Sequence, residues 1–148
     1  MDRKHRRLLV YGLLFLVPWS VVNARGVVTF VFPFGLLNFG PLQLTDVVSF
    51  ATVYSRRLPD FLLGWPVGVG LYVAGLASVL SGLLAGREDP RVTAGLFAFA
   101  GATQATLVLG FARRTGTTAV PVGAALLWLA VWWFDWPAVR RTLAVERP

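Results

Sequence analysis

Long stretches of this chain contain no charged residue. Asp, Glu, Lys and Arg are absent from residues 61–86, 92–112 and 115–134. Each stretch could cross the roughly 30 Å hydrocarbon core of a bilayer, which takes about 20 helical residues. A fourth apolar segment, residues 8–24, follows a basic N-terminus. The sequence therefore predicts four transmembrane helices, over about residues 8–24, 61–86, 92–112 and 117–136.

The composition agrees with an integral membrane protein. Of the 148 residues 56% are hydrophobic and 14% are charged, and the mean hydropathy is +0.66. Such a chain is too apolar for an ordinary soluble domain. We expect an all-α fold, a bundle of four transmembrane helices that forms a single membrane domain over residues 1–148.

The basic residues lie in short groups at the ends of the apolar segments, where Arg and Lys anchor helices to lipid head groups. Membrane lipids are therefore the expected partners of this charge, and nucleic acid is not expected. With four spans and a cytoplasmic N-terminus, nine of the 14 basic residues face the cytoplasm and five lie outside. The positive-inside rule then places both termini on the cytoplasmic side of the cell membrane. The nine residues are Arg3, Lys4, Arg6, Arg7, Arg87, Arg91, Arg140, Arg141 and Arg147.

The N-terminal segment has a second interpretation. The basic residues 2–7, the apolar run and Val22-Asn23-Ala24 fit a secretory signal with a cleavable V-x-A end. Pro18-Trp19 favours instead a retained helix with an interfacial anchor.

Residues 25–60 are expected to form an apolar extracytoplasmic loop. Pro33, Gly35, Asn38, Gly40 and Pro41 interrupt residues 26–45, so this part is interfacial or re-entrant, although a fifth span is the alternative. Residues 46–54 are predicted to be a short interfacial helix, with a strand as the alternative. The apolar face of this helix is Val47, Phe50, Ala51 and Tyr54.

Small side chains recur every four residues in the second and third spans, which predicts close contact between these two helices. The short connection at Asp89-Pro90 makes the helices antiparallel neighbours. We expect Ser78 and Ala102 to lie at similar depth. The predicted packing residues are Gly70, Ala74, Ser78 and Gly82 on one helix and Ala98, Ala102 and Thr106 on the other.

Few polar residues lie at membrane depth. Gln104 is expected to form an interhelical hydrogen bond, with a substrate contact as the alternative. Asp135 is expected to form a salt bridge with Arg140. Trp132, Trp133 and Trp136 are interpreted as an aromatic belt at the inner interface, with a ligand-binding aromatic box as the alternative.

The residue inventory gives no catalytic constellation. The chain has no cysteine and one histidine, His5, which lies in the basic tail. Thiolate chemistry is therefore excluded, and a Ser-His-Asp triad or a histidine metal site would need to include this tail. We expect no cofactor and no metal, and no enzymatic activity.

Several short motifs resemble a family of small uncharacterised membrane proteins of halophilic archaea. The resemblance covers most of the chain and implies a four-span membrane protein without an assigned activity. Its motifs are Pro18-Trp19, residues 32–38, Leu58-Pro59, Trp65-Pro66, Leu71-Tyr72, residues 91–96 and Pro121-Val122-Gly123.

The favoured function is that of a non-enzymatic membrane subunit or accessory component, assembling with itself or with another membrane protein. The expected partner surface lies in the outer segment and includes Phe32, Phe34 and Phe50, since this segment is too apolar to remain solvated. A small transporter or channel is the main alternative, and an intramembrane lipid enzyme is a further one.

Overall fold

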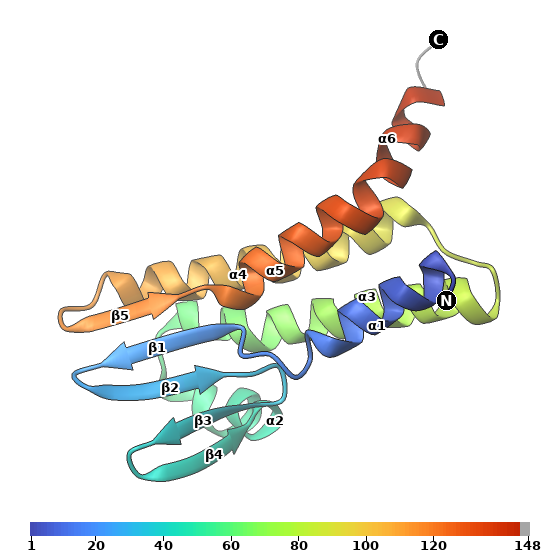
Figure 1. Cartoon of the computed structure of the whole chain (residues 1–148). Helices are drawn as coiled ribbons and strands as arrows, with labels where there is room; N and C mark the ends of the chain where they lie inside the picture. Colours follow the sequence, from blue (N-terminus) through green and yellow to red (C-terminus); the bar gives the residue numbers. More distant parts are fainter. Residues whose placement is uncertain (146–148) are drawn as a thin grey trace.

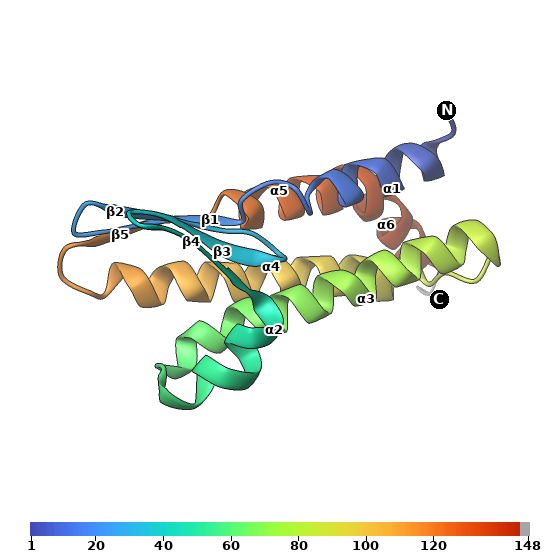
Figure 2. The ribbon, with the colours of Figure 1, turned by 90° about the horizontal axis from the view of Figure 1, so that it is seen from below.

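The computed structural model describes residues 1–145, so Arg147 lies outside the described residues. The fold has two layers. Helices α3 (Gly64–Leu84) and α4 (Pro90–Ala112) form an antiparallel hairpin, and helix α1 (Arg3–Leu13), helix α5 (Val122–Ala130) and a β-sheet lie against it. Figures 1 and 2 show the sheet beside α4 rather than beyond its end.

Three helices are long and apolar enough to cross a membrane by length and composition. They are Asp60–Leu84, Pro90–Ala112 and Val122–Val145. Asp89 begins the second of them, because its side chain accepts a hydrogen bond from the Arg91 N–H at 2.9 Å and Pro90 occupies the first turn. Membrane-length helices are thus confirmed for three segments, whereas the sequence predicts four.

The prediction of an all-α fold is wrong, because the described chain contains a five-stranded antiparallel sheet. The strand order is β4-β3-β2-β1-β5. Four strands form a consecutive meander, and the fifth arrives from the segment after α4. The strands are β1 (Ser20–Ala24), β2 (Val27–Val31), β3 (Gly35–Phe39), β4 (Leu42–Asp46) and β5 (Thr117–Val120).

The predicted helix over residues 8–24 ends early, because α1 stops at Leu13 and the chain continues into β1. A two-residue turn then joins β1 to β2. Arg25 and Gly26 both have positive φ, 51° and 88°, as the common hairpin turn of this length requires. The Arg25 N–H also donates to the carbonyl of Gly116, which ties this turn to the connection before β5.

The predicted short helix over residues 46–54 is helical in the structure. Its first turn is α2 (Val47–Ser49), and the π-helix η1 (Phe50–Tyr54) continues it. Two 3₁₀ turns, η2 (Ser55–Arg57) and η3 (Asp60–Leu63), then lead into α3.

The predicted span over residues 117–136 begins as the strand β5. Pro121 separates this strand from α5, as expected for a proline that favours extended backbone before it. The helix then continues as the π-helix η4 (Val131–Asp135) and as α6 (Trp136–Val145). The π segment ends two residues before Pro137, whose missing N–H an uninterrupted α-helix does not accommodate.

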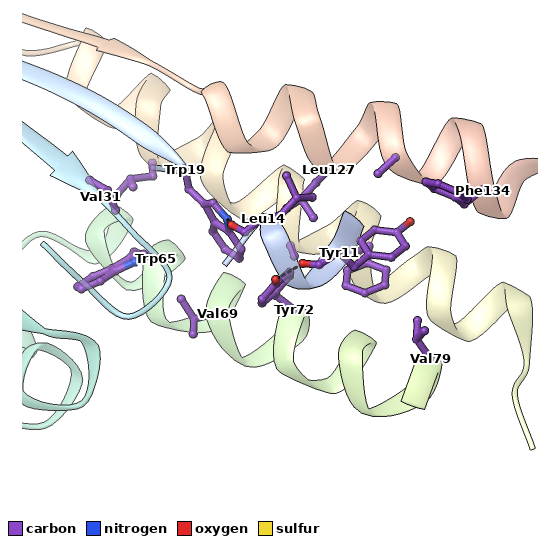
Figure 3. Packing of buried hydrophobic residues seen from close by; sticks show 14 of the residues in the cluster. Tyr11, Leu14, Trp19, Val31, Trp65, Val69, Tyr72, Val79, Leu127 and Phe134 are labelled. Carbon is purple, nitrogen blue, oxygen red and sulfur yellow. Dashed lines mark hydrogen bonds between the residues drawn. The ribbon is translucent and has the colours of Figure 1, made fainter. Parts of the chain in front are cut away.

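Aromatic residues fill the core between the layers (Figure 3). The Tyr11 ring stacks on Phe97 with ring centres 3.8 Å apart, and Trp19 meets Tyr72 edge to face at 4.9 Å. The Trp19 indole N–H donates to the carbonyl of Leu14 at 3.0 Å. These contacts fix α1 and the start of β1 against α3 and α4.

The start of α1 lies at the same end of the molecule as the α3–α4 connection and α6 (Figure 1). A hydrogen bond of 3.3 Å from the Arg3 guanidinium to the carbonyl of Phe134 joins α1 to η4 there. We call this the inner end. The opposite end, which carries the β1–β2 turn and Gly116, is the outer end.

Candidate functional site

One face of the sheet is apolar across all five strands and points away from the helices. A single row of directly opposite residues runs through Val120, Val21, Phe30, Leu37 and Leu44. Strand residues two apart share a face, so Phe39 and Leu42 extend this surface at the β3–β4 turn. We call these residues the outer sheet face.

Aromatic rings form a continuous chain along this side of the molecule. Phe39 contacts Phe30 edge to face with ring centres 5.5 Å apart, and Phe30 lies 6.5 Å from Phe32. Phe32 stacks on Phe34 at 5.0 Å, and Phe34 lies 5.6 Å from Phe15, just after α1. The predicted partner residues Phe32 and Phe34 therefore belong to one apolar surface.

Strand β4 is an edge of the sheet, since β3 is its only neighbour among the described strands. Its apolar side chains are open: Leu42 is 74% exposed and Leu44 is 61% exposed. An edge strand carries unpaired backbone N–H and C=O groups, and an apolar edge is a template for pairing with another strand. Residues 42–46 contain no Lys and no Pro, and the one charged residue of the strand, Asp46, lies at its end, where it caps α2.

Asp46 ends β4 and caps α2. Its carboxylate accepts a hydrogen bond of 2.8 Å from the Ser49 N–H. This bond to the charged form holds the pKa of the Asp46 carboxyl below its ordinary value of 3.8. The cap fixes where the strand stops and the helix begins.

The opposite face of the sheet covers a cavity of about 280 Å³ in front of α3 and α4. Phe50, the third predicted partner residue, lies at this cavity, is buried, and contacts Trp65 edge to face at 4.9 Å. Thr29 donates a hydrogen bond to the Asn38 side chain in the cavity wall. The remaining lining residues are Val22, Ala24, Val31, Leu36, Leu58, Leu62, Leu107 and Phe111.

A buried ionic cluster lies at the inner end. One Arg7 guanidinium nitrogen is 2.6 Å from the Glu88 carboxylate, and the other pairs with Asp135. The Tyr11 hydroxyl donates to the second oxygen of Asp135. The expected salt bridge from Asp135 to Arg140 is thus replaced by one to Arg7, which joins α1, the α3–α4 connection and η4.

A family model described as "Domain of unknown function (DUF8050)" matches residues 1–145. The chain belongs to this family. No curated protein and no solved structure matches the chain. The family description names no activity, so it assigns no residue roles, and the resemblance to a family of halophilic archaea stays a prediction.

Of the predicted packing residues of α3, Ser78 lies at the contact with α4 and Gly82 lies against the α3–α4 connection. The hydroxyl oxygens of Ser78 and Thr93 are 2.6 Å apart, and a Cβ added to Gly82 would collide with the Glu88 side chain. Gly70 and Ala74 are exposed instead. Nothing lies within 4 Å of a Cβ added to Gly70.

The closest approach of α3 to α4 uses two glycines outside the predicted row. A Cβ on Gly68 would meet the side chains of Thr103 and Gln104, and a Cβ on Gly75 would lie 2.8 Å from the Phe97 ring. Of the predicted packing residues of α4, Thr106 lies at the start of α3, where its hydroxyl is 3.4 Å from a Cβ added to Gly64. Ala98 and Ala102 are half-buried and Thr106 is exposed.

Gln104 is fully buried, and neither its amide oxygen nor its amide nitrogen has a hydrogen-bond partner among the described residues. The predicted interhelical hydrogen bond is therefore not formed. A buried amide without a partner costs about 1–3 kcal/mol. Within residues 1–145 no group of three or more His, Asp or Glu residues is placed to hold a metal ion.

Proposed function

We propose that this protein is a non-enzymatic, multi-pass subunit of the cell membrane that assembles with a second copy of itself through the β4 edge. The observation that carries the proposal is an open, apolar edge strand beside helices of membrane length. Open sheet edges are not tolerated in the hydrocarbon region, because unpaired backbone groups find no water there. Pairing β4 with another strand satisfies those groups.

The arrangement of the chain supports a membrane orientation with both termini on the cytoplasmic side. The start of α1 and α6 lie together at the inner end, with Arg3 bonded to η4. The basic residues Arg3, Lys4, Arg6 and Arg7 belong to that end, and the positive-inside rule assigns such clusters to the cytoplasm. The sheet then lies in the outer half of the membrane, toward the extracytoplasmic side.

A two-fold axis at Leu44 gives the best pairing of two β4 strands. Antiparallel strands then place Leu44 opposite its own copy and Gln43 opposite Thr45, so all five strand residues pair. An axis at Gln43 would instead bring Pro41, which has no N–H, into the ladder. Pairing at Leu44 also continues the apolar outer sheet face from one copy into the other.

Cysteine crosslinking tests this pairing, and the native chain gives no background because it contains no cysteine. Directly opposite residues in antiparallel strands have Cα atoms about 4.5–5.5 Å apart, within the range that a disulfide bridges. Leu44→Cys should therefore form a covalent dimer in membranes. Leu42→Cys is the matched control, since it lies on the same strand and face and is more exposed.

In the proposed register the two Leu42 positions are separated by four residues along the strand, about 13 Å. Equal crosslinking of both variants would indicate random collision and would contradict the proposal. A Leu44→Lys variant adds an independent test, because two like charges directly opposite each other destabilise a strand pair. The mass in mild detergent should change from a dimer to a monomer. A wild-type chain that is monomeric, or bound through β4 to a different chain, would overturn the pairing with itself.

The alternative of a small transporter or channel has less support. The cavity beneath the sheet is lined mainly by aliphatic and aromatic side chains, and none of the described residues around it is charged. A path for a polar solute needs groups that replace its hydration. Solute-specific leakage from liposomes that contain a monomeric Leu44→Lys variant would favour transport over assembly.

A further inference from the structure

A second surface lies at the inner end, far from β4. Arg3 and Arg6 of α1 and Arg140 of α6 surround a pocket of about 500 Å³, together with Trp132, Trp133 and Trp136. No acidic residue lines it among the described residues. The indoles are open, with Trp132 60% and Trp133 62% exposed.

The nearby carboxylates do not neutralise this pocket. Asp135 and Glu88 are both bonded to Arg7, which points into the buried ionic cluster instead. Within the described part of the chain, neither Arg6 nor Arg140 forms a salt bridge. Three guanidinium groups, which bind phosphate oxygens with fixed N–H geometry, thus share one open, electropositive site.

An apolar groove continues from this pocket toward the outer end. It has a volume of about 430 Å³ and shares Trp132 and Trp133 with the pocket. Val10 of α1 and Leu14, directly after α1, form one side, and Leu126 and Leu129 of α5 are on the other. A site with a cationic head and an apolar tail fits an amphiphile.

We infer that the crevice between α1 and the α5–α6 helix binds one anionic phospholipid. The phosphate group lies among Arg3, Arg6 and Arg140, and one acyl chain lies in the groove beside Leu126 and Leu129. The three tryptophans sit at the junction, where indole rings prefer the level of the head groups. The groove selects a lipid over free phosphate, because inorganic phosphate has no apolar chain that could occupy the groove.

Native mass spectrometry of the purified full chain measures this binding directly. The probes are phosphatidylglycerol, phosphatidylcholine of the same acyl chains, and inorganic phosphate. The wild-type chain should retain one phosphatidylglycerol and release phosphatidylcholine at lower collision energy. Inorganic phosphate at millimolar concentration should neither bind nor displace the lipid.

Arg6→Gln with Arg140→Gln should weaken phosphatidylglycerol binding by about 30-fold, since each arginine near an anionic lipid contributes roughly a tenfold or smaller factor. Arg56→Gln with Arg57→Gln is the matched control: it removes the same charge from exposed residues before α3 and should leave binding unchanged. Arg6→Lys with Arg140→Lys keeps the charge and should retain most of the affinity. Far-ultraviolet circular dichroism should be the same for all variants, because the substituted side chains are exposed.

Three results would overturn the inference. Equal loss in the control pair would show that binding follows net charge and not this pocket. Equal retention of phosphatidylcholine would show that the site does not select an anion. Binding of inorganic phosphate as tight as that of the lipid would show that the groove plays no part.

Discussion

Removing Arg7 should destabilise the protein strongly, because two carboxylates depend on this one cation. The Arg7 side chain is 12% exposed, and those of Glu88 and Asp135 are 15% and 1% exposed. Loss of one partner from a buried ion pair costs about 3–5 kcal/mol, since the remaining charge stays buried without compensation. We therefore expect Arg7→Met to lower the free energy of unfolding by about that amount.

Thermal unfolding in detergent, followed by circular dichroism, measures this loss. For a chain of this size 1 kcal/mol corresponds to about 2–4 °C in Tm, so the shift should be at least about 6 °C. Arg87→Met is the control, because Arg87 lies beside Glu88 on the α3–α4 connection and is exposed. Its effect should stay within about 0.5 kcal/mol.

A triple variant separates the loss of charge balance from the loss of packing. Arg7→Met with Glu88→Gln and Asp135→Asn removes the cation and both anions together, so no charge remains buried. Most of the stability should return, as it does when buried ion pairs are replaced by neutral groups. An Arg7→Met protein as stable as Arg87→Met would refute the cluster. A triple variant no better than Arg7→Met would assign the effect to packing of the arginine side chain.

Three further outcomes follow from the structure. The free energy of unfolding should fall as the pH drops below about 3.8 and through the lowered pKa of Asp46, because the cap hydrogen bond needs the carboxylate. Acid titration followed by circular dichroism measures this loss, and Asp46→Asn should keep the cap without the pH dependence. A cysteine pair at Ser78 and Thr93 should crosslink, whereas Ser78 with Ala102 should not, as gel mobility under oxidising conditions will show. Gln104→Leu should raise the free energy of unfolding by about 1–3 kcal/mol, since it removes an amide without a partner; a loss of stability would mean that this amide is paired in the membrane.

Helices α3 and α4 could be predicted from the sequence alone. The charge-free residues 61–86 contain α3, and the charge-free residues 92–112 cover α4 from its third residue onward, because a helix in lipid needs only a local run of apolar residues. The register between these helices was harder to predict. A count from the turn at Asp89 pairs Ser78 with Ala102, but the chain leaves α3 at Leu84 and enters α4 at Pro90, so Ser78 meets Thr93.

The sheet could not be found from local hydropathy alone. Residues 8–24 are as apolar as a helix requires, yet β1 pairs with β2 on one side and with β5, from residues 117–120, on the other. The second pairing joins segments far apart in the sequence, which no window over residues 8–24 contains. The two-residue Arg25-Gly26 turn between two valine-rich runs is a hairpin signal that could have indicated β1 and β2.

The ionic cluster could not be predicted for the same reason: its residues are far apart in the sequence. Asp135 and Arg140 are close in the sequence, and their pairing needs only one helix. Arg7 reaches Asp135 because α1 packs beside α5 and η4, so the pair depends on the tertiary fold. A basic residue directly before an apolar run gave no sign that it points inward.

The mixed second layer matches the length of α3 and also ends in an open sheet edge. Helix α3 has 21 residues and is about 32 Å long. Helix α1, with 11 residues, provides about 17 Å, and the five-residue strand β1 provides about as much again, so together they match α3. A helix satisfies its own backbone groups and offers none to a partner, whereas a strand leaves one side free. Because the chain continues from α1 into a strand and not into further helix, the second layer includes a sheet whose last edge, β4, has backbone groups available. Crosslinking at Leu44 measures whether a second copy uses them.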